Sequence, residues 1–202
     1  MVLRALKLFE LILPAILWML LLFGFDSPPL AISTLIAAAL HELGHISYLF
    51  FHGNGISLFA ARANGLRLYP LGTLSYREEA TFAAAGPFAN LIFALIFFLS
   101  SKVFGEYFLL LSVINVMTML SNLLPIEGQD GYNLLLAIFA EKYDSAERIL
   151  RRISFFFSAT LSFLALYLIE KLDTGYWIFA LFSIYAYTFI KKSQKMAFFE
   201  NS

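Results

Sequence analysis

Long apolar runs, separated by short polar joints, make up most of the chain. A helix needs about 20 apolar residues to cross a bilayer, and six segments approach that length: 6–25, 29–52, 80–101, 106–126, 154–170 and 175–190. Several joints contain Pro, Gly or Asp, which favour turns. We therefore predict an all-α polytopic membrane protein with about six transmembrane helices. It forms a single domain over residues 1–202, with its core at about 29–140.

The segment between the second and third apolar runs has a different pattern. Residues 56–76 are less apolar, and Asn64-Gly65 is a strong hairpin turn. Leu66-Arg67-Leu68-Tyr69 alternates as a half-buried strand does. We predict a small β-hairpin here, between helices 2 and 3.

Composition supports a membrane protein and excludes other classes. Hydrophobic residues make up 60% of the 202 residues, and charged residues only 14%, against about 25% in a soluble domain. The mean hydropathy is +0.78. Zero net charge gives no sign of nucleic-acid binding. The chain has no cysteine, which excludes disulfides and thiolate metal sites. The first apolar run lacks a clear cleavage site, so we expect a retained helix rather than a signal peptide.

The distribution of Lys and Arg predicts the orientation. Cytoplasmic loops carry an excess of these residues. With both termini in the cytoplasm, only Lys102 and Lys171 of the 14 fall outside. The other twelve fall inside: Arg4, Lys7, Arg62, Arg67, Arg77, Lys142, Arg148, Arg151, Arg152, Lys191, Lys192 and Lys195. The second and fourth spans then both run from outside to inside.

An H-E-x-x-H motif, His41-Glu42-Leu43-Gly44-His45, lies inside the second apolar run. Residues four apart share a helix face, so both histidines can bind one Zn²⁺ ion. Glu42 is adjacent to that face, where a general base takes a proton from metal-activated water. Ionisable groups inside a span are costly and functional by default. This favours a metal site over a chance pairing in a helix core.

Catalytic zinc usually has three protein ligands, so a third must come from elsewhere. His52 is the only other histidine, but it lies about 10 Å further along the helix. We expect His52 to cap the helix end instead. Asp130 follows the inner end of the fourth span, where Asn122-Leu123-Leu124-Pro125 interrupts the helix. The topology thus places Asp130 near His45 and makes it the better candidate, although Asp130-Gly131 alone is also a common turn pair.

The combination of motifs resembles the site-2 protease family of intramembrane zinc metalloproteases. The matching residues are His41 to His45, then Gly86-Pro87-Phe88-Ala89-Asn90, then Asn122-Leu123-Leu124-Pro125 leading to Asp130-Gly131. The resemblance implies one Zn²⁺ per chain, bound by His41, His45 and Asp130, with Glu42 as the catalytic base.

The resemblance also implies roles for residues outside the zinc site. Asn122 would bind substrate or stabilise the oxyanion, with Asn90, Gly86, Pro87 and Pro125 supporting the site or substrate. The β-hairpin would be part of a small membrane-associated β-sheet, which would take the substrate as an added strand. Each of these has a plainer alternative: the two Asn side chains could simply hold helices together, and the hairpin could simply cover the site.

The expected function is zinc metalloendopeptidase activity on a peptide bond in or near a transmembrane segment. The chain most resembles a minimal sporulation-type member, similar to stage IV sporulation factor B, with no PDZ or nucleotide-binding domain. That subtype implies a membrane-tethered regulator, such as a pro-sigma or anti-sigma factor, as substrate in regulated intramembrane proteolysis. The expected partners are a single-span or membrane-associated substrate, the bilayer and a regulatory membrane protein.

The expected location is the cell membrane, with cytoplasmic termini and the site toward the cytoplasmic half.

Two alternative functions stay open. A catalytically inactive relative acting as a binding scaffold would lose the base or a ligand, and all four residues are present. A metal transporter would need more polar residues along the spans than this sequence has.

Overall fold

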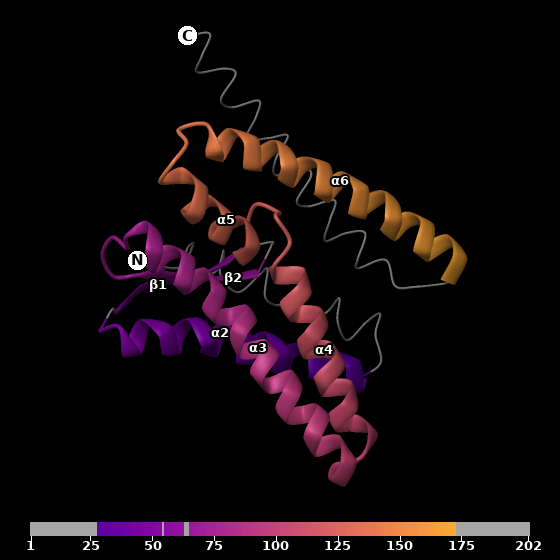
Figure 1. The fold of residues 1–202 in the computed structure, drawn as a ribbon. Helices are drawn as coiled ribbons and strands as arrows, with labels where there is room; N and C mark the ends of the chain where they lie inside the picture. Colours follow the sequence, from indigo (N-terminus) through magenta and orange to yellow (C-terminus); the bar gives the residue numbers. More distant parts are fainter. Residues whose placement is uncertain (1–27, 54, 63–64, 173–202) are drawn as a thin grey trace, which may run out of the picture.

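The computed structural model describes residues 28–53, 55–62 and 65–172 (Figure 1). Its elements in chain order are α2 (Pro28–Phe51), β1 (Ile56–Arg62), β2 (Gly65–Pro70), α3 (Tyr76–Phe104), α4 (Glu106–Asn122), α5 (Asp130–Ala140) and α6 (Ala146–Leu172). The described chain is therefore mostly helical, as predicted. The predicted first and sixth spans, 6–25 and 175–190, lie outside the described residues.

Helices α2 and α3 agree best with the apolar pattern. Among the described residues, they are the two helices long and apolar enough to cross a membrane. Helix α3 begins at Tyr76, earlier than predicted, because Ser75 and Glu78 form a capping box. The Ser75 backbone N–H donates to the Glu78 carboxylate at 2.8 Å, and Glu78 N–H donates back to Ser75 Oγ at 3.4 Å. The helix then continues through Pro87 to Phe104.

Helices α4 and α6 differ from the predicted spans. Helix α4 ends at Asn122 instead of residue 126, because Pro125 disfavours helical backbone in the residue before it. Helix α6 begins at Ala146 instead of residue 154, so its first turns are charged and include an ion pair between Arg151 and Glu147. Hydropathy locates apolar segments and therefore misses a charged turn that is helical all the same.

Strands β1 and β2 form a two-stranded antiparallel sheet. Arg62 pairs with Gly65, and the register continues outward with one irregularity between Ile56 and Leu58. The sheet lies against α2 through β2. The predicted turn at Asn64-Gly65 includes residues 63–64, which lie outside the described residues.

Helices α3 and α4 form an antiparallel hairpin, and α2 packs across both (Figure 1). The hairpin turns at Gly105, whose φ of +87° favours glycine. Gly44 allows α2 to approach α3 closely, since a Cβ there would lie 2.5 Å from the Ala85 carbonyl oxygen. Helix α5 packs on α3, and α6 packs on α5. The chain thus brings its short helix α5 back to the helices that carry the central motifs.

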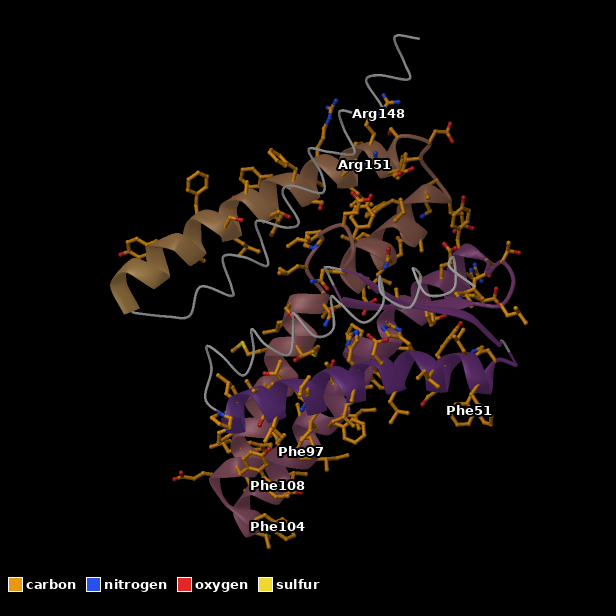
Figure 2. The ribbon with its side chains drawn as sticks, turned by 180° about the vertical axis from the view of Figure 1, so that it is seen from behind. Phe51, Phe97, Phe104, Phe108, Arg148 and Arg151 are labelled. Carbon is orange, nitrogen blue, oxygen red and sulfur yellow. The ribbon has the colours of Figure 1, made fainter. Side chains whose placement is uncertain are left out.

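A group of aromatic side chains and a pair of arginines lie at opposite ends of the described structure. Figure 2 shows Phe97, Phe104 and Phe108 at the tip of the α3–α4 hairpin, with Arg148 and Arg151 at the start of α6, far from that tip. Large apolar side chains are also exposed along α3, for example Val103 at 78%. Soluble monomers rarely expose such a continuous apolar surface.

Candidate metal centre

Helix α2 presents His41 and His45 on one buried face. The two residues are one turn apart, and their side chains are 7% and 5% exposed. Their Nε2 atoms lie 3.3 Å from each other, with the two rings nearly perpendicular. The helical spacing in H-E-x-x-H therefore brings two imidazole nitrogens to one point.

Asp130 reaches the same point from α5, which it begins. Its Oδ2 atom lies 2.9 Å from His41 Nε2 and 3.1 Å from His45 Nε2. Gly131 permits this approach, because a Cβ there would overlap the carbonyl group of Leu123 in the loop after α4. The three residues predicted as zinc ligands are thus brought together from segments 85 residues apart.

The hydrogen bonds of the two histidines determine which nitrogen faces the cluster. His45 Nδ1 lies 2.9 Å from the Phe82 carbonyl oxygen, which can only accept, so Nδ1 carries the proton. His41 Nδ1 lies 2.7 Å from Asn90 Oδ1. Asn90 is completely buried, and its Nδ2 donates to the Ala37 carbonyl at 2.9 Å, so its oxygen faces His41. Both Nε2 atoms therefore keep a lone pair toward Asp130.

This donor set fits a zinc ion. The three ligand atoms lie within 4.8 Å of one another, and a tetrahedral zinc with bonds of about 2.0–2.1 Å separates its ligand atoms by roughly 3.3 Å. Two imidazole lone pairs and a carboxylate oxygen pointing at one another are stabilised by a cation between them. Histidines held through their second nitrogen are also typical of zinc proteins.

Gly86 provides room for the cluster. A Cβ atom at this position would lie 2.7 Å from both Cε1 and Nε2 of His41, and nearer still to His45 Nε2. The backbone of α3 therefore lies directly against the two imidazoles. Pro87 is buried beside it in the same helix. The Gly-Pro pair predicted to support the site is in direct contact with it through Gly86.

The remaining predicted site residues lie at different distances from the cluster. Glu42 is half-buried and close enough for its charge to interact with both histidines and Asp130. Asn122 ends α4, and its amide donates to the Thr118 carbonyl at 3.0 Å. Pro125 is half-buried in the loop that leads to Asp130.

His52 caps α2 as predicted, with Nδ1 2.9 Å from the Tyr48 carbonyl and its ring stacked on Tyr48.

Sequence reasoning missed two contributors. The Phe82 carbonyl holds His45, but a backbone group leaves no trace in the residue pattern. Asn115, in the middle of α4, is completely buried and accepts a hydrogen bond from Asn90 at 2.9 Å. A lone amide inside an apolar run was the available signal, because buried polar groups in such helices need partners.

No protein-family model matches the sequence, and the comparison with curated proteins finds no match either. Among solved structures, the chain is similar to a site-2 protease from Methanocaldococcus jannaschii, with a TM-score of 0.65. The match has 22% sequence identity and covers 90% of this chain and 88% of the other. The chain has the site-2 protease fold. This similarity agrees with the mostly helical fold that the three motifs implied, whereas the six membrane spans stay a prediction.

Proposed function

We propose that this chain is an intramembrane zinc metalloprotease that hydrolyses a peptide bond in or near the transmembrane segment of another protein. The observation that carries the proposal is the convergence of His41 Nε2, His45 Nε2 and Asp130 Oδ2 on one buried point. Glu42, next to His41 in the chain, is close enough to interact with all three. The site lies on α2, an apolar helix long enough to span a membrane. The similarity of the fold to a protein named as a site-2 protease supports the same conclusion.

His41, His45 and Asp130 would hold one Zn²⁺ per chain. Zinc, when bound, supplies a Lewis acid and lowers the pKa of a coordinated water toward about 7. The Glu42 carboxylate takes a proton from the attacking water and delivers it to the leaving amide nitrogen. The carbon–nitrogen bond then breaks, with one water added overall. The hydrogen bonds from Asn90 and Phe82 hold the two imidazoles in place throughout.

Asn122 is the proposed donor to the substrate carbonyl. Its Nδ2 donates one N–H to the Thr118 carbonyl within its own helix, and because an amide nitrogen carries two N–H groups, the second can donate to the substrate. A donor aimed at developing negative charge commonly stabilises a transition state by a few kcal/mol. Its position at the end of α4, before the loop that leads to Asp130, is consistent with that role.

The substrate must be extended at the scissile bond, because a helical amide is shielded by its own hydrogen bonds. We propose that an edge of the β1–β2 sheet binds the unwound segment as an added strand. Main-chain hydrogen bonds along a sheet edge can form with almost any substrate sequence, because they do not involve side chains. The contact between β2 and α2 places this sheet next to the helix that carries both histidines.

The proposed substrate class is a membrane-tethered regulator, such as a pro-sigma or anti-sigma factor. Its support is the resemblance of the sequence to a minimal sporulation-type member of the family. We further propose a multi-pass protein with both termini in the cytoplasm and the site in the cytoplasmic half of the membrane. The distribution of Lys and Arg supports that orientation.

The test uses the purified full chain, a single-span substrate protein and three variants. Glu42→Gln should lower kcat/KM by about 10²- to 10⁴-fold, as expected for loss of a general base, while zinc stays bound. Asp130→Asn should lose bound zinc together with cleavage. Glu79→Gln is the matched control, because Glu79 is exposed and makes no side-chain contact with the cluster; it should cleave as the wild type does.

Three results would contradict the proposal. Cleavage that survives Glu42→Gln excludes the mechanism, and the absence of one zinc per wild-type chain excludes the site. Stoichiometric zinc without cleavage of any membrane substrate would instead favour the inactive scaffold. Metal analysis and gel-based cleavage assays on the same preparations separate these cases.

A further inference from the structure

A chain of buried hydrogen bonds links α4 to the metal centre. Asn115 and Asn90 are both completely buried. The Asn115 amide donates from Nδ2 to the Leu111 carbonyl at 2.8 Å and accepts at Oδ1 from Asn90 Nδ2 at 2.9 Å. Asn90 then accepts from His41 Nδ1 at 2.7 Å. Helix α4 supplies no ligand atom, yet it reaches a predicted ligand through two amides.

The direction of this chain is determined by two backbone carbonyls. The oxygens of Leu111 and Ala37 can only accept hydrogen bonds. Asn115 must therefore turn its Nδ2 toward Leu111 and its oxygen toward Asn90. Asn90 directs both N–H groups to acceptors, one on Ala37 and one on Asn115. Rotating either amide by half a turn would place oxygen against oxygen in a buried site, where unpaired polar groups are costly.

The direction of these hydrogen bonds determines which nitrogen of His41 carries the proton. With the Asn90 oxygen facing it, His41 Nδ1 must be the donor, and Nε2 keeps its lone pair toward Asp130 and His45. We propose that Asn115 is a positioning residue for the metal centre, which acts through Asn90 to orient His41 and set its tautomer. The inference rests on the proposed zinc site and extends it to a helix without a ligand.

A neighbouring hydrogen bond separates this role from simple helix packing. Ser112 lies on the same buried face of α4, and its hydroxyl donates to the Ala94 carbonyl of α3 at 2.8 Å. It joins the same two helices as the Asn115–Asn90 pair, but it does not touch a residue that holds a histidine. If Asn115 served only to join α3 and α4, the two positions would respond alike.

The experiment compares zinc affinity and the spectrum of a substituted metal in the full chain. Zinc dissociation constants come from chelator competition, and the visible absorption of Co²⁺ reports ligand geometry. Asn115→Leu removes the acceptor for Asn90 and should weaken zinc binding about 10- to 100-fold, the usual effect of losing a residue behind a metal ligand. Its Co²⁺ spectrum should change as well.

Two further variants serve as a rescue and as a control for helix packing. Asn115→Asp keeps an acceptor oxygen toward Asn90, and a protonated carboxyl group in this buried site can donate its O–H to the Leu111 carbonyl as the amide does. It should therefore recover most of the zinc affinity and the wild-type Co²⁺ spectrum. Ser112→Ala should retain both, although it also removes a buried bond between α3 and α4. Wild-type affinity in Asn115→Leu, or an equal loss in Ser112→Ala, would overturn the proposal.

A second measurement does not depend on whether Asn115→Leu folds. The ¹⁵N histidine spectrum of the zinc-loaded wild type should show His41 protonated at Nδ1 and bound through Nε2. Coordination through Nδ1 would overturn the proposal without any variant. A wild type that binds no zinc would contradict the proposed function itself. A wild type that binds zinc and cleaves, with Asn115 variants that match Ser112→Ala, would remove only the positioning role.

Discussion

Gly86 illustrates how one residue can decide whether the centre assembles. Glycine inside a helix costs about 1 kcal/mol relative to alanine, so local preference opposes it at this position. A Cβ there would nevertheless lie 2.7 Å from His41 Nε2 and closer to His45 Nε2. The missing side chain is therefore explained by the two imidazoles that occupy its place.

We expect Gly86→Ala to weaken zinc binding. The added methyl group must displace one or both histidine rings, and a loss of about 10- to 100-fold in affinity is typical when ligand orientation is disturbed. Chelator competition on the folded variant gives the measurement. Gly55→Ala is the control, since a Cβ there would meet only the flexible Leu71 side chain, at 3.3 Å. An unchanged zinc affinity in Gly86→Ala would contradict this prediction, because it would show that α3 can shift away from the histidines without weakening zinc binding.

Helix α3 brings three contacts to the site at regular spacing. The Phe82 carbonyl, the Gly86 backbone and the Asn90 amide recur every four residues and face His45 and His41. Residues four apart share a helix face, so a single rotation and axial position of α3 satisfies all three. The capping box at Ser75 determines where this helix begins. It lies less than two turns before the first of these contacts.

Removing the cap should destabilise the fold without altering the site directly. Ser75→Ala loses the side-chain acceptor for Glu78 N–H and should lower the free energy of unfolding by about 1 kcal/mol. Denaturant titration in detergent micelles measures this change. Glu79→Ala tests a neighbouring first-turn carboxylate without a cap hydrogen bond and should have a smaller effect. An equal effect from both would attribute the loss to charge rather than capping.

At the largest scale, the two ends of the described structure carry different side chains. The tip of the α3–α4 hairpin carries aromatic side chains, whereas the start of α6 carries arginines (Figure 2). A bilayer favours Lys and Arg on the cytoplasmic side. We therefore propose that the hairpin tip faces outward and that the loop between α5 and α6 faces the cytoplasm. In this orientation, α5 ends at the cytoplasmic side, and its first residue, Asp130, lies deeper in the membrane than that end.

Cysteine accessibility tests this orientation cleanly, because the chain has no cysteine of its own. In intact cells, an impermeant maleimide should label Lys102→Cys, near the hairpin tip, but not Asp144→Cys, between α5 and α6. Both positions are exposed, and neither change reduces the excess of positive charge inside. After permeabilisation, both should react. The reverse pattern in intact cells would overturn the orientation and the proposed cytoplasmic site.

Features that depend on neighbouring residues were predictable from the chain. The spacing of His41 and His45 on one face follows from helix geometry alone, and Pro125 accounts for the end of α4 nearby. The prediction that Asp130 lies near His45 needed one further step. The distribution of Lys and Arg indicated that the second and fourth spans run in the same direction, which brings the end of the fourth span to the same side as His45. The structure brings all three side chains together, as the topology predicted.

Features that depend on how helices pack were not predictable. Asn115 and Asn122 lie two turns apart on α4, and both are amides in an apolar run. Sequence reasoning singled out Asn122 for contact with the substrate and did not consider Asn115, which the structure shows as the buried partner of Asn90. Helical periodicity is local and shows which residues share a face. The axial position of one helix against another results from the packing of all its neighbours, so the connection from α4 to His41 could emerge only once the helices were assembled.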